Sequence, residues 1–216
     1  MKILVTGASG GIGRAICRKF LEQGHEVIGM DIMPSAIQDD HYTHVQHDIR
    51  KEPYPEISGV EVFVGCAGIQ NQSVEDIEVN LTAAISVTEH YAFQEKIRAV
   101  VQIASASGLT GSEFPHYAAS KGGLVAYTKN IALRLAKYGA CANSLCPGGV
   151  ITELNRHILE NEELYQAVLD ESLLNRWAEP EEIAEWTYFL ACVNRSMTGE
   201  NLLIDNGEAL KANFIW

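Results

Sequence analysis

The sequence predicts an α/β fold in which a doubly wound parallel sheet lies between two layers of helices. Short β-prone runs alternate with segments of helical periodicity, which is the pattern of a parallel sheet with helical crossovers. The length of 216 residues suits one domain with a sizeable core. Because we find no internal repeat and no low-complexity tract, we expect residues 1–216 to form a single three-layer domain.

The composition indicates a soluble globular protein, with 47% hydrophobic and 20% charged residues. A net charge of −12 argues against nucleic acid and anionic membrane surfaces as partners. No apolar run is long enough to span a bilayer, and the opening MKILVTGASG lacks the long apolar core of a signal peptide. Five cysteines without a CxxC pair suit reduced thiols better than disulfides, so we expect a cytoplasmic protein.

The N-terminal segment predicts a strand–helix–strand unit that binds a dinucleotide. A β-prone run from Lys2 to Val5 leads into the glycine-rich turn TGASGGIG, and the helical pattern that follows stops at Gly24. The second strand, from His25 to Met30, ends at Asp31. Glycines let the backbone approach a pyrophosphate, and the helix N-terminus supplies amide donors, so we expect a Rossmann-type fold. The predicted cofactor loop consists of Gly7, Ser9, Gly10, Gly11, Ile12 and Gly13.

Asp31 predicts which dinucleotide is used. A carboxylate at the end of the second strand can accept hydrogen bonds from the adenosine ribose hydroxyls and would repel a 2′-phosphate. The next residue is Ile32, and the loop holds no Lys or Arg before Arg14. We therefore predict NAD(H) rather than NADP(H). After the third strand, Asp48 and Ile49 are candidates for contact with the adenine.

The spacing of His41, His44 and His47 follows an HxxHxxH pattern that could suggest a metal site. The segment alternates as a strand does, and successive residues of a strand point to opposite faces. The three imidazoles would then not converge on one ion, so we predict no metal site.

The connection between the third and fourth strands is short. Residues 50–60 include Pro53 and Pro55 and leave room for no more than a stub of helix, whereas a parallel crossover usually takes a dozen or more residues. The fourth strand, Glu61 to Gly65, follows.

Small residues come directly after the fourth strand. Cys66, Ala67 and Gly68 leave room for a cofactor across the strand ends, and Cys66 is interpreted as a small core residue. Asn80 lies in a segment of helical periodicity, where Asn is mildly unfavourable, so a functional role is expected. An exposed polar position is the alternative.

The stretch from Val100 to Leu124 carries the predicted chemistry. It begins as a buried strand, breaks at small residues, and restarts as a helix with Tyr117 and Lys121 four residues apart. Residues four apart lie on the same helix face, so the phenol and the ammonium can reach one site. A free phenol has a pKa near 10, and a neighbouring cation lowers it. Ser105, at the strand end, can polarise a carbonyl oxygen there. A buried ring beside a solvated amine is the alternative interpretation.

The remaining chain predicts further helices and strands. The helix of Tyr117 continues to Lys137, and Pro147 with Gly148 forces a turn after the next strand. Thr152 is expected to cap the helical segment that follows. The last predicted elements are strands at Ala140–Leu145 and Asn201–Ile204 and helices at Glu153–Leu174 and Glu181–Val193.

With these motifs the chain resembles the short-chain dehydrogenase/reductase family nearly from end to end. The turn is similar to the family's TGxxxGxG loop at Thr6, Gly7, Gly11 and Gly13. Cys66 to Gly68 is similar to the family's NAG motif, with Cys in place of Asn. The match to the catalytic tetrad falls on Asn80, Ser105, Tyr117 and Lys121. The match to the loop that holds the nicotinamide amide falls on Pro147, Gly148, Val150 and Thr152. Ser107 competes with Ser105, but Ser105 directly follows the strand.

The resemblance implies an NAD(H)-dependent oxidoreductase that interconverts a secondary alcohol and a ketone by hydride transfer. Tyr117 would exchange the proton on the substrate oxygen, and Lys121 would lower the tyrosine pKa and bind the nicotinamide ribose. Ser105 would hydrogen-bond the substrate oxygen, and Asn80 would hold a water that relays protons. Residues 153–174 correspond to the family's mobile lid. Its apolar face suggests a hydrophobic substrate body, and its acidic character argues against a highly anionic one.

Other functions share part of this pattern. A non-catalytic NAD(H) sensor and a 3-oxoacyl-thioester reductase of the same family are alternatives, and a sugar-nucleotide epimerase would need a longer chain. The sequence around Cys66 and the GMDI segment is similar to a hydroxysteroid dehydrogenase/carbonyl reductase branch. The chain is shorter than the usual family member, before the fourth strand and between Gly68 and Asn80, which puts the outer helix there in doubt.

The resemblance also implies a homodimer or homotetramer. The expected contacts are the long helix from Gly122 to Lys137 and the final helix and strand. The apolar tail Phe214–Trp216 would be awkward if exposed, so we expect it at a subunit interface.

Overall fold

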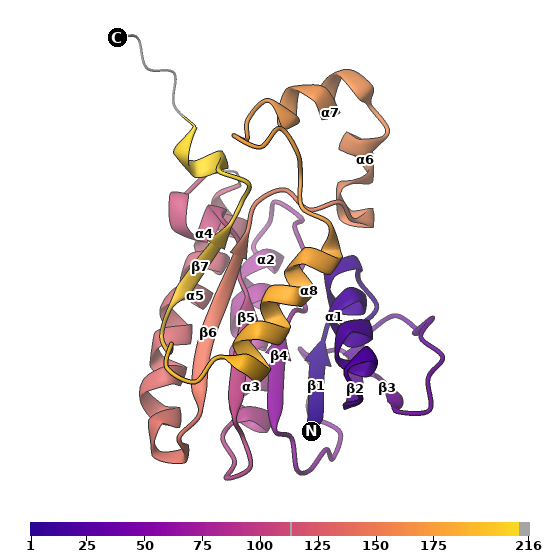
Figure 1. Cartoon of the computed structure of the whole chain (residues 1–216), viewed down its shortest axis with the longest axis vertical. Helices are drawn as coiled ribbons and strands as arrows, with labels where there is room; N and C mark the ends of the chain where they lie inside the picture. The colour runs from indigo at the N-terminus through magenta and orange to yellow at the C-terminus, as the bar shows by residue number, and fades with distance from the viewer. Residues whose placement is uncertain (113, 212–216) are drawn as a thin grey trace.

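A computed structural model of the chain, which describes residues 1–112 and 114–211, shows one parallel sheet of seven strands in the order β3-β2-β1-β4-β5-β6-β7 (Figure 1). The predicted doubly wound α/β fold is confirmed. The strands are β1 (Lys2–Thr6), β2 (Glu26–Asp31), β3 (Tyr42–Gln46), β4 (Val62–Gly65), β5 (Ala99–Ile103), β6 (Cys141–Pro147) and β7 (Asn201–Ile204).

Both faces of the sheet are buried under helices. The longer helices are α1 (Gly11–Glu22), α3 (Ala84–Ala92), α5 (Pro115–Leu135) and α8 (Pro180–Tyr188). Alternation along β1 divides the core: Ile3 and Val5 pack into the cluster that contains α1 and α8, whereas Leu4 packs into the cluster that contains α3 and α5. Because the central strands contact both clusters, β1, β4 and β5 are mostly apolar, as buried parallel strands usually are, whereas the edge strand β3 is partly polar and has no fully buried residue.

The strand order reverses between β1 and β4, and ligands of open α/β sheets bind outside the carboxyl ends of the strands at such a point. The short elements gather along this edge or continue the longer helices. They are α2 (Glu75–Ile77), η1 (Glu78–Ala83), α4 (Ser107–Thr110), η2 (Ala136–Tyr138), η3 (Glu153–Asn155), α6 (Arg156–Leu159), α7 (Glu162–Leu169), η4 (Phe189–Val193) and η5 (Glu208–Leu210). Figure 1 shows α6 and α7 standing above the carboxyl edge of the sheet.

Two predicted segments differ in the structure. Residues 47–61 contain no helix, so not even the expected stub forms between β3 and β4, where Pro53 and Pro55 disfavour one. The segment expected to be one helix from Glu153 to Leu174 is broken into η3, α6 and α7. Asn161 marks the break, since it lies outside the helical region and its side-chain oxygen accepts a hydrogen bond from the Leu164 amide at 3.0 Å.

Within residues 1–112 and 114–211, no helix has the length and apolar character needed to cross a membrane. All five cysteines are free thiols. The predicted interface segment Phe214–Trp216 lies outside the described residues.

Candidate active site

Apart from Asp48, Ile49 and Asn80, the predicted site residues come from six separate segments, and the fold brings them to the carboxyl edge of the sheet. The cofactor loop follows β1, Asp31 ends β2, and Cys66 to Gly68 follow β4. Ser105 follows β5, and the turn at Gly148 follows β6. Tyr117 and Lys121 lie in the first turns of α5. The chain therefore places these side chains on both sides of the point where the strand order reverses.

The cofactor loop is a tight turn that lies directly against the end of β4. The Thr6 hydroxyl accepts hydrogen bonds from the amides of Cys66 and Ala67 at 3.2 and 3.3 Å. Gly7 has φ +68°, and a Cβ there would lie 2.7 Å from the Ala67 backbone. A Cβ on Gly13 would lie 2.0 Å from the Gly7 carbonyl oxygen. Because a side chain fits at neither position, the glycines are required for the turn itself.

Asp31 is fixed in place at the end of β2. One carboxylate oxygen accepts a hydrogen bond from the Ser9 amide and the other from the Met33 amide, each at 2.9 Å. Each oxygen retains a lone pair for a further donor. Asp31 therefore joins the cofactor loop to β2 and presents a carboxylate of defined orientation beside that loop.

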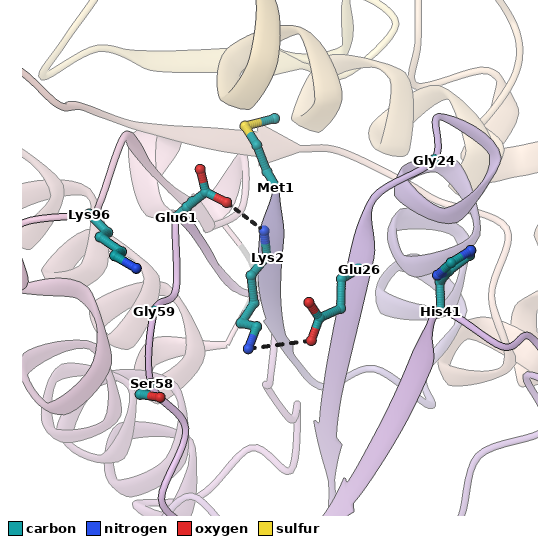
Figure 2. Close-up of a pocket in the computed structure, with 9 residues that line it drawn as sticks. All are labelled: Met1, Lys2, Gly24, Glu26, His41, Ser58, Gly59, Glu61 and Lys96. Carbon is teal, nitrogen blue, oxygen red and sulfur yellow. Dashed lines mark hydrogen bonds and ion pairs between the residues drawn. The ribbon is translucent and has the colours of Figure 1, made fainter.

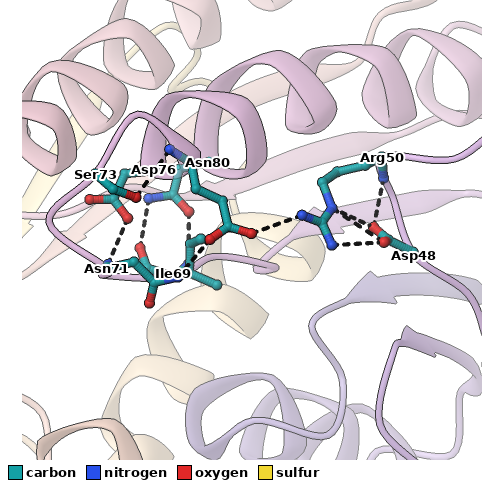
Figure 3. Close-up of polar contacts among 8 residues, drawn as sticks. Asp48, Arg50, Ile69, Asn71, Ser73, Asp76 and Asn80 are labelled. Atoms are coloured by element: carbon teal, nitrogen blue, oxygen red, sulfur yellow. Dashed lines mark hydrogen bonds and ion pairs between the residues drawn. The ribbon is translucent and has the colours of Figure 1, made fainter.

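The Asp48 carboxylate is paired with Arg50 (Figure 3). It accepts hydrogen bonds from the Arg50 guanidinium at 2.9 and 3.0 Å, and these hold the pKa of Asp48 below its usual value. Arg50 also donates to Glu75 at 2.9 Å. Ile49 is buried in the core next to α3. The predicted adenine contacts of Asp48 and Ile49 stay predictions, and a contact by Asp48 would be made by a carboxylate that already pairs with Arg50.

Lys121 is buried between strand ends and the tyrosine ring. Its side chain is 5% exposed, its ammonium donates to the Ile103 carbonyl at 3.0 Å, and it lies 5.7 Å from the centre of the Tyr117 ring. Burial lowers the pKa of Lys121 to about 8. The predicted proximity of the tyrosine and the lysine is thus present, but the amine is buried rather than solvated.

Cys66 and Gly68 are neighbours of the same ammonium. Burial raises the pKa of the Cys66 thiol to about 12, which keeps it protonated at neutral pH. A Cβ on Gly68 would lie 3.3 Å from the Lys121 nitrogen and 3.2 Å from the Asn80 amide oxygen. The small residues after β4 therefore leave the space that Lys121 and Asn80 occupy.

Ser105 and Ser107 form a hydroxyl pair after β5. Both are buried, and their oxygen atoms are 2.8 Å apart. The same turn packs on α5, since a Cβ on Gly108 would lie 2.7 Å from the Lys121 backbone. Three residues separate the end of β5 at Ile103 from Ser107, and Ser105 is the first residue with a hydroxyl group beyond the strand.

Asn80 lies in η1, a π-helical turn within an otherwise α-helical segment. Its side chain accepts from the Ile69 amide and donates to the Ile69 carbonyl, both at 2.8 Å, and it also donates to the Ser120 hydroxyl at 3.2 Å. Figure 3 shows Asn80 beside the loop that it holds. Such π turns are frequent at functional sites, and the predicted helical setting of Asn80 is confirmed in this modified form.

The sequence did not indicate Ser120, although it lies directly before Lys121 in the helix. The Ser120 hydroxyl donates to the Tyr117 carbonyl at 2.7 Å and is fully buried. It therefore connects Asn80 to the helical turn that carries the tyrosine. Its position in the segment YAASK, between the predicted Tyr117 and Lys121, could have drawn attention to it. Sequence spacing, however, does not identify which residues the hydroxyl of a helical serine contacts.

The turn after β6 reaches back to the cofactor loop. The Gly148 amide donates to the Ile204 carbonyl at 3.0 Å, and Val150 is buried. Thr152 precedes η3, but its side chain makes no capping hydrogen bond, so that expectation is wrong. Instead its methyl group would lie 2.8 Å from a Cβ on Gly11. Thr152 packs against the cofactor loop rather than against the helix it precedes.

An ion pair joins the same two segments. Arg14 of α1 donates to Glu153 of η3 at 2.7 Å and holds the pKa of Glu153 below its usual value. The two residues are 139 positions apart in sequence, so no local pattern could predict the contact.

The rings of His44 and His47 have separate partners. His44 contacts the Tyr42 hydroxyl at 3.1 Å and the Met33 carbonyl at 2.9 Å, and His47 contacts the Lys51 carbonyl at 2.8 Å. No group of three or more potential metal ligands was found in the described part of the chain.

A polar cavity of about 510 Å³ lies at the other end of the sheet (Figure 2). Lys2 forms an ion pair with Glu26 across it at 3.4 Å, and Lys96 points into it from the opposite wall. None of the predicted site residues lines this cavity.

Sequence comparison gives a family match that covers most of the chain. The family model described as "Enoyl-(Acyl carrier protein) reductase" matches residues 58–208. An uncharacterized short-chain type dehydrogenase/reductase of Sinorhizobium fredii is 32% identical over 95% of this chain, and the match covers 43% of that relative, so the chain spans less than half of its length. The 3-oxoacyl-(acyl-carrier-protein) reductase of Vibrio cholerae is 28% identical over 94% of this chain and 95% of its own.

Solved structures of similar fold extend over nearly the full length. A 4-hydroxyisoleucine dehydrogenase complexed with NADH is 28% identical, with a TM-score of 0.87, and the match covers 98% of this chain and 99% of that one. The aldohexose dehydrogenase of Thermoplasma acidophilum, in ligand-free form, is 25% identical, with a TM-score of 0.87, over 100% of this chain and 96% of that one.

Proposed function

This chain is a member of the short-chain dehydrogenase/reductase family, and on that premise we propose that it uses NAD(H) to interconvert a secondary alcohol and a ketone. One observation carries the proposal. The buried Lys121 ammonium lies over the Tyr117 ring, next to Gly68 and Asn80, and the Ser105 turn packs on the same stretch of α5. A proton donor, a cation and a hydroxyl are thus gathered at the ligand-binding edge of the sheet.

The cofactor cradle fits a dinucleotide. The α1 helix begins at Gly11 with no side-chain cap, so its first amides are available to a pyrophosphate, and the turn leaves no room for a side chain at Gly7 or Gly13. When bound, the nicotinamide would supply or accept the hydride. Gly7, Ser9, Gly10, Gly11, Ile12 and Gly13 would hold the pyrophosphate, and Pro147, Gly148, Val150 and Thr152 would hold the nicotinamide amide.

Asp31 is the reason for choosing NAD(H). Its oriented carboxylate can accept from the two ribose hydroxyls and would repel a 2′-phosphate. The 4-hydroxyisoleucine dehydrogenase of similar fold binds NADH. Replacing Asp31 by Asn should relax the preference, because the repulsion is lost. A wild-type protein with lower Kd for NADPH than for NADH would contradict the assignment.

The chain's own residues would act on the substrate oxygen. Tyr117 would donate its phenolic proton as the ketone is reduced and recover it in the reverse direction. The Lys121 ammonium favours the phenolate, and Ser105 would donate a hydrogen bond to the same oxygen. Asn80 would hold the water through which the proton is replaced.

The lid, proposed to comprise residues 153–174, indicates the class of substrate. It exposes Leu154 and Leu164, which suit an apolar substrate body. All six of its carboxylates are exposed, against a single arginine, Arg156, and no lysine. The acidic side chains are Glu153, Glu160, Glu162, Glu163, Asp170 and Glu171. This charge would repel a phosphorylated thioester, so we favour an uncharged ketone over a carrier-bound acyl group.

The thioester alternative is favoured by one finding, the likeness to a 3-oxoacyl-(acyl-carrier-protein) reductase. Acetoacetyl-coenzyme A and the uncharged acetoacetyl-N-acetylcysteamine share the reacting ketone, so they separate charge from chemistry. We expect a higher kcat/KM for the uncharged thioester. The difference between the two kcat/KM values should become smaller as added salt screens the charge of the lid. A preference for the coenzyme A thioester at low salt would contradict the proposed charge discrimination.

Self-association is proposed through the apolar side chains left on the surface. Leu133 of α5 is 79% exposed, and Trp186, Phe189 and Val193 are exposed along α8 and η4. Light scattering on the wild type and on Phe189→Glu tests this. A wild-type mass of one chain would remove the proposed homodimer or homotetramer.

The proposed activity is tested with purified protein, NAD⁺ or NADH, and a panel of secondary alcohols and ketones. Turnover is followed at the NADH absorbance band, and NADH binding is measured separately by fluorescence. We expect both binding and turnover. Binding without turnover on any panel member would support the non-catalytic sensor instead, and an absence of NADH and NADPH binding would remove both.

A further inference from the structure

Ser105 and Ser107 share one hydrogen-bonding arrangement at the end of β5. The two hydroxyl oxygens are 2.8 Å apart, and the Ser107 amide also lies 3.3 Å from the Ser105 oxygen as a donor. Ser105 is 8% exposed and Ser107 is 3% exposed. Ser107 therefore contacts the Ser105 hydroxyl through its backbone and through its side chain, and both contacts lie away from water.

A count of donors and acceptors shows what this arrangement does. A serine hydroxyl has one proton to donate and two lone pairs. The Ser107 amide occupies one lone pair of Ser105. If Ser105 gives its proton to Ser107, it has none left for a substrate oxygen. If Ser107 is the donor, both lone pairs of Ser105 are occupied and its proton is directed elsewhere.

We infer that Ser107 is a positioning residue that donates to Ser105 and so directs the Ser105 proton to the substrate oxygen. The inference rests on the proposed function, in which Ser105 touches that oxygen. A hydroxyl that accepts one hydrogen bond becomes a stronger donor of its own, because hydrogen bonds in a chain polarise one another. Ser107 thus both orients Ser105 and strengthens its hydrogen bond to the substrate.

A double-mutant cycle distinguishes this role from a structural one. We expect Ser107→Ala to lower kcat about tenfold with little change in NADH affinity, which corresponds to the loss of one modest hydrogen bond in the transition state. Ser105→Ala should have a larger effect. In the Ser105→Ala background, Ser107→Ala should have no further effect, because its action passes through Ser105.

Thr110→Val is the matched control. Thr110 lies in the same short helix, and its hydroxyl donates to the Ala106 carbonyl at 3.2 Å, so it stabilises the turn without contacting Ser105. Its kcat should stay near that of the wild type. Ser107→Cys fills the buried position with a weaker donor, and it serves as a second variant if Ser107→Ala does not fold. Its kcat should also fall.

The kcat values of all variants are measured with whichever substrate the wild type turns over. An equal loss from Ser107→Ala in both backgrounds, or a larger loss from Ser107→Ala than from Ser105→Ala, would overturn the inference. Either result would leave the proposed oxidoreductase activity intact. Failure of the wild type to turn over any substrate would instead overturn the proposed function.

Discussion

Asn80 provides the clearest test of how the site is held together. Its side chain is 1% exposed and makes three hydrogen bonds, two to the Ile69 backbone and one to Ser120. A typical intramolecular hydrogen bond contributes about 1 kcal/mol, and a buried partner left unsatisfied costs about 1–3 kcal/mol. Ser120 keeps its bond to the Tyr117 carbonyl, so the main loss falls on the Ile69 backbone. We expect Asn80→Ala to lower the free energy of unfolding by roughly 2–4 kcal/mol.

Urea denaturation followed by far-ultraviolet circular dichroism measures this loss directly. For a domain of this size, each kcal/mol shifts Tm by about 2–4 °C. Asn80→Asp should also destabilise, because it keeps the acceptor for the Ile69 amide but loses both donors. Asn130→Ala is the control, since Asn130 is exposed on α5 and its amide oxygen accepts a hydrogen bond from the exposed side chain of Arg134. A free energy for Asn80→Ala within about 0.5 kcal/mol of the wild type would refute the reasoning.

Three further predictions follow from individual residues. Burial lowers the pKa of Lys121 from 10.5 to about 8, so between these pH values the unfolded chain binds more protons than the folded one. The free energy of unfolding of the wild type, relative to that of Lys121→Met, should therefore rise with pH by up to roughly 3 kcal/mol. A difference between the two proteins that does not change with pH in urea titrations would contradict this. Gly13→Ala should lower NADH affinity and Tm because its Cβ meets the Gly7 carbonyl, whereas Gly10→Ala, whose Cβ has 3.5 Å of clearance, should spare Tm. Arg176 lowers the pKa of Glu182 to about 2, so the stability that this carboxylate contributes is present above pH 4.5 and lost as pH falls toward 2. Since the pair is exposed, Glu182→Gln should lower the free energy of unfolding by about 1 kcal/mol at neutral pH and weaken the fall of Tm at acid pH.

The architecture could be predicted because it depends on short-range patterns. The strand from Asn201 to Ile204 has the predicted bounds, and α1 ends just before Gly24, whose φ of +74° fits a helix terminator. Where the end of a strand depends on pairing across the sheet, the predicted and observed bounds differ. The strand predicted at Ala140–Leu145 instead runs from Cys141 to Pro147, where Pro147 pairs with Ile204 of β7.

The contacts within the site could be predicted only in part. The four-residue spacing of Tyr117 and Lys121 requires a shared helix face, and the structure shows it. The Ser105–Ser107 pair, the link from Asn80 to Ser120 and the Arg14–Glu153 ion pair were not predicted. The last two join residues far apart in the chain, and the first depends on how one turn packs on α5, so neither periodicity nor motif spacing contains them.

The prediction of one continuous helix over residues 153–174 failed for a local reason. Apolar residues recur at helical spacing from Glu153 onward, which favoured one continuous helix. Asn161 adopts an extended backbone and caps a new helix instead. Asn is a strong N-cap residue, so the break was available in the sequence as a competing signal.

Turnover by Tyr117→Phe tests the central claim most directly, because the substitution removes one oxygen and leaves the ring beside Lys121. The account predicts that kcat falls by about 10²–10⁴-fold while NADH binds with unchanged affinity. Near-normal turnover by this variant would contradict the assignment of the Tyr117 phenol as the proton donor.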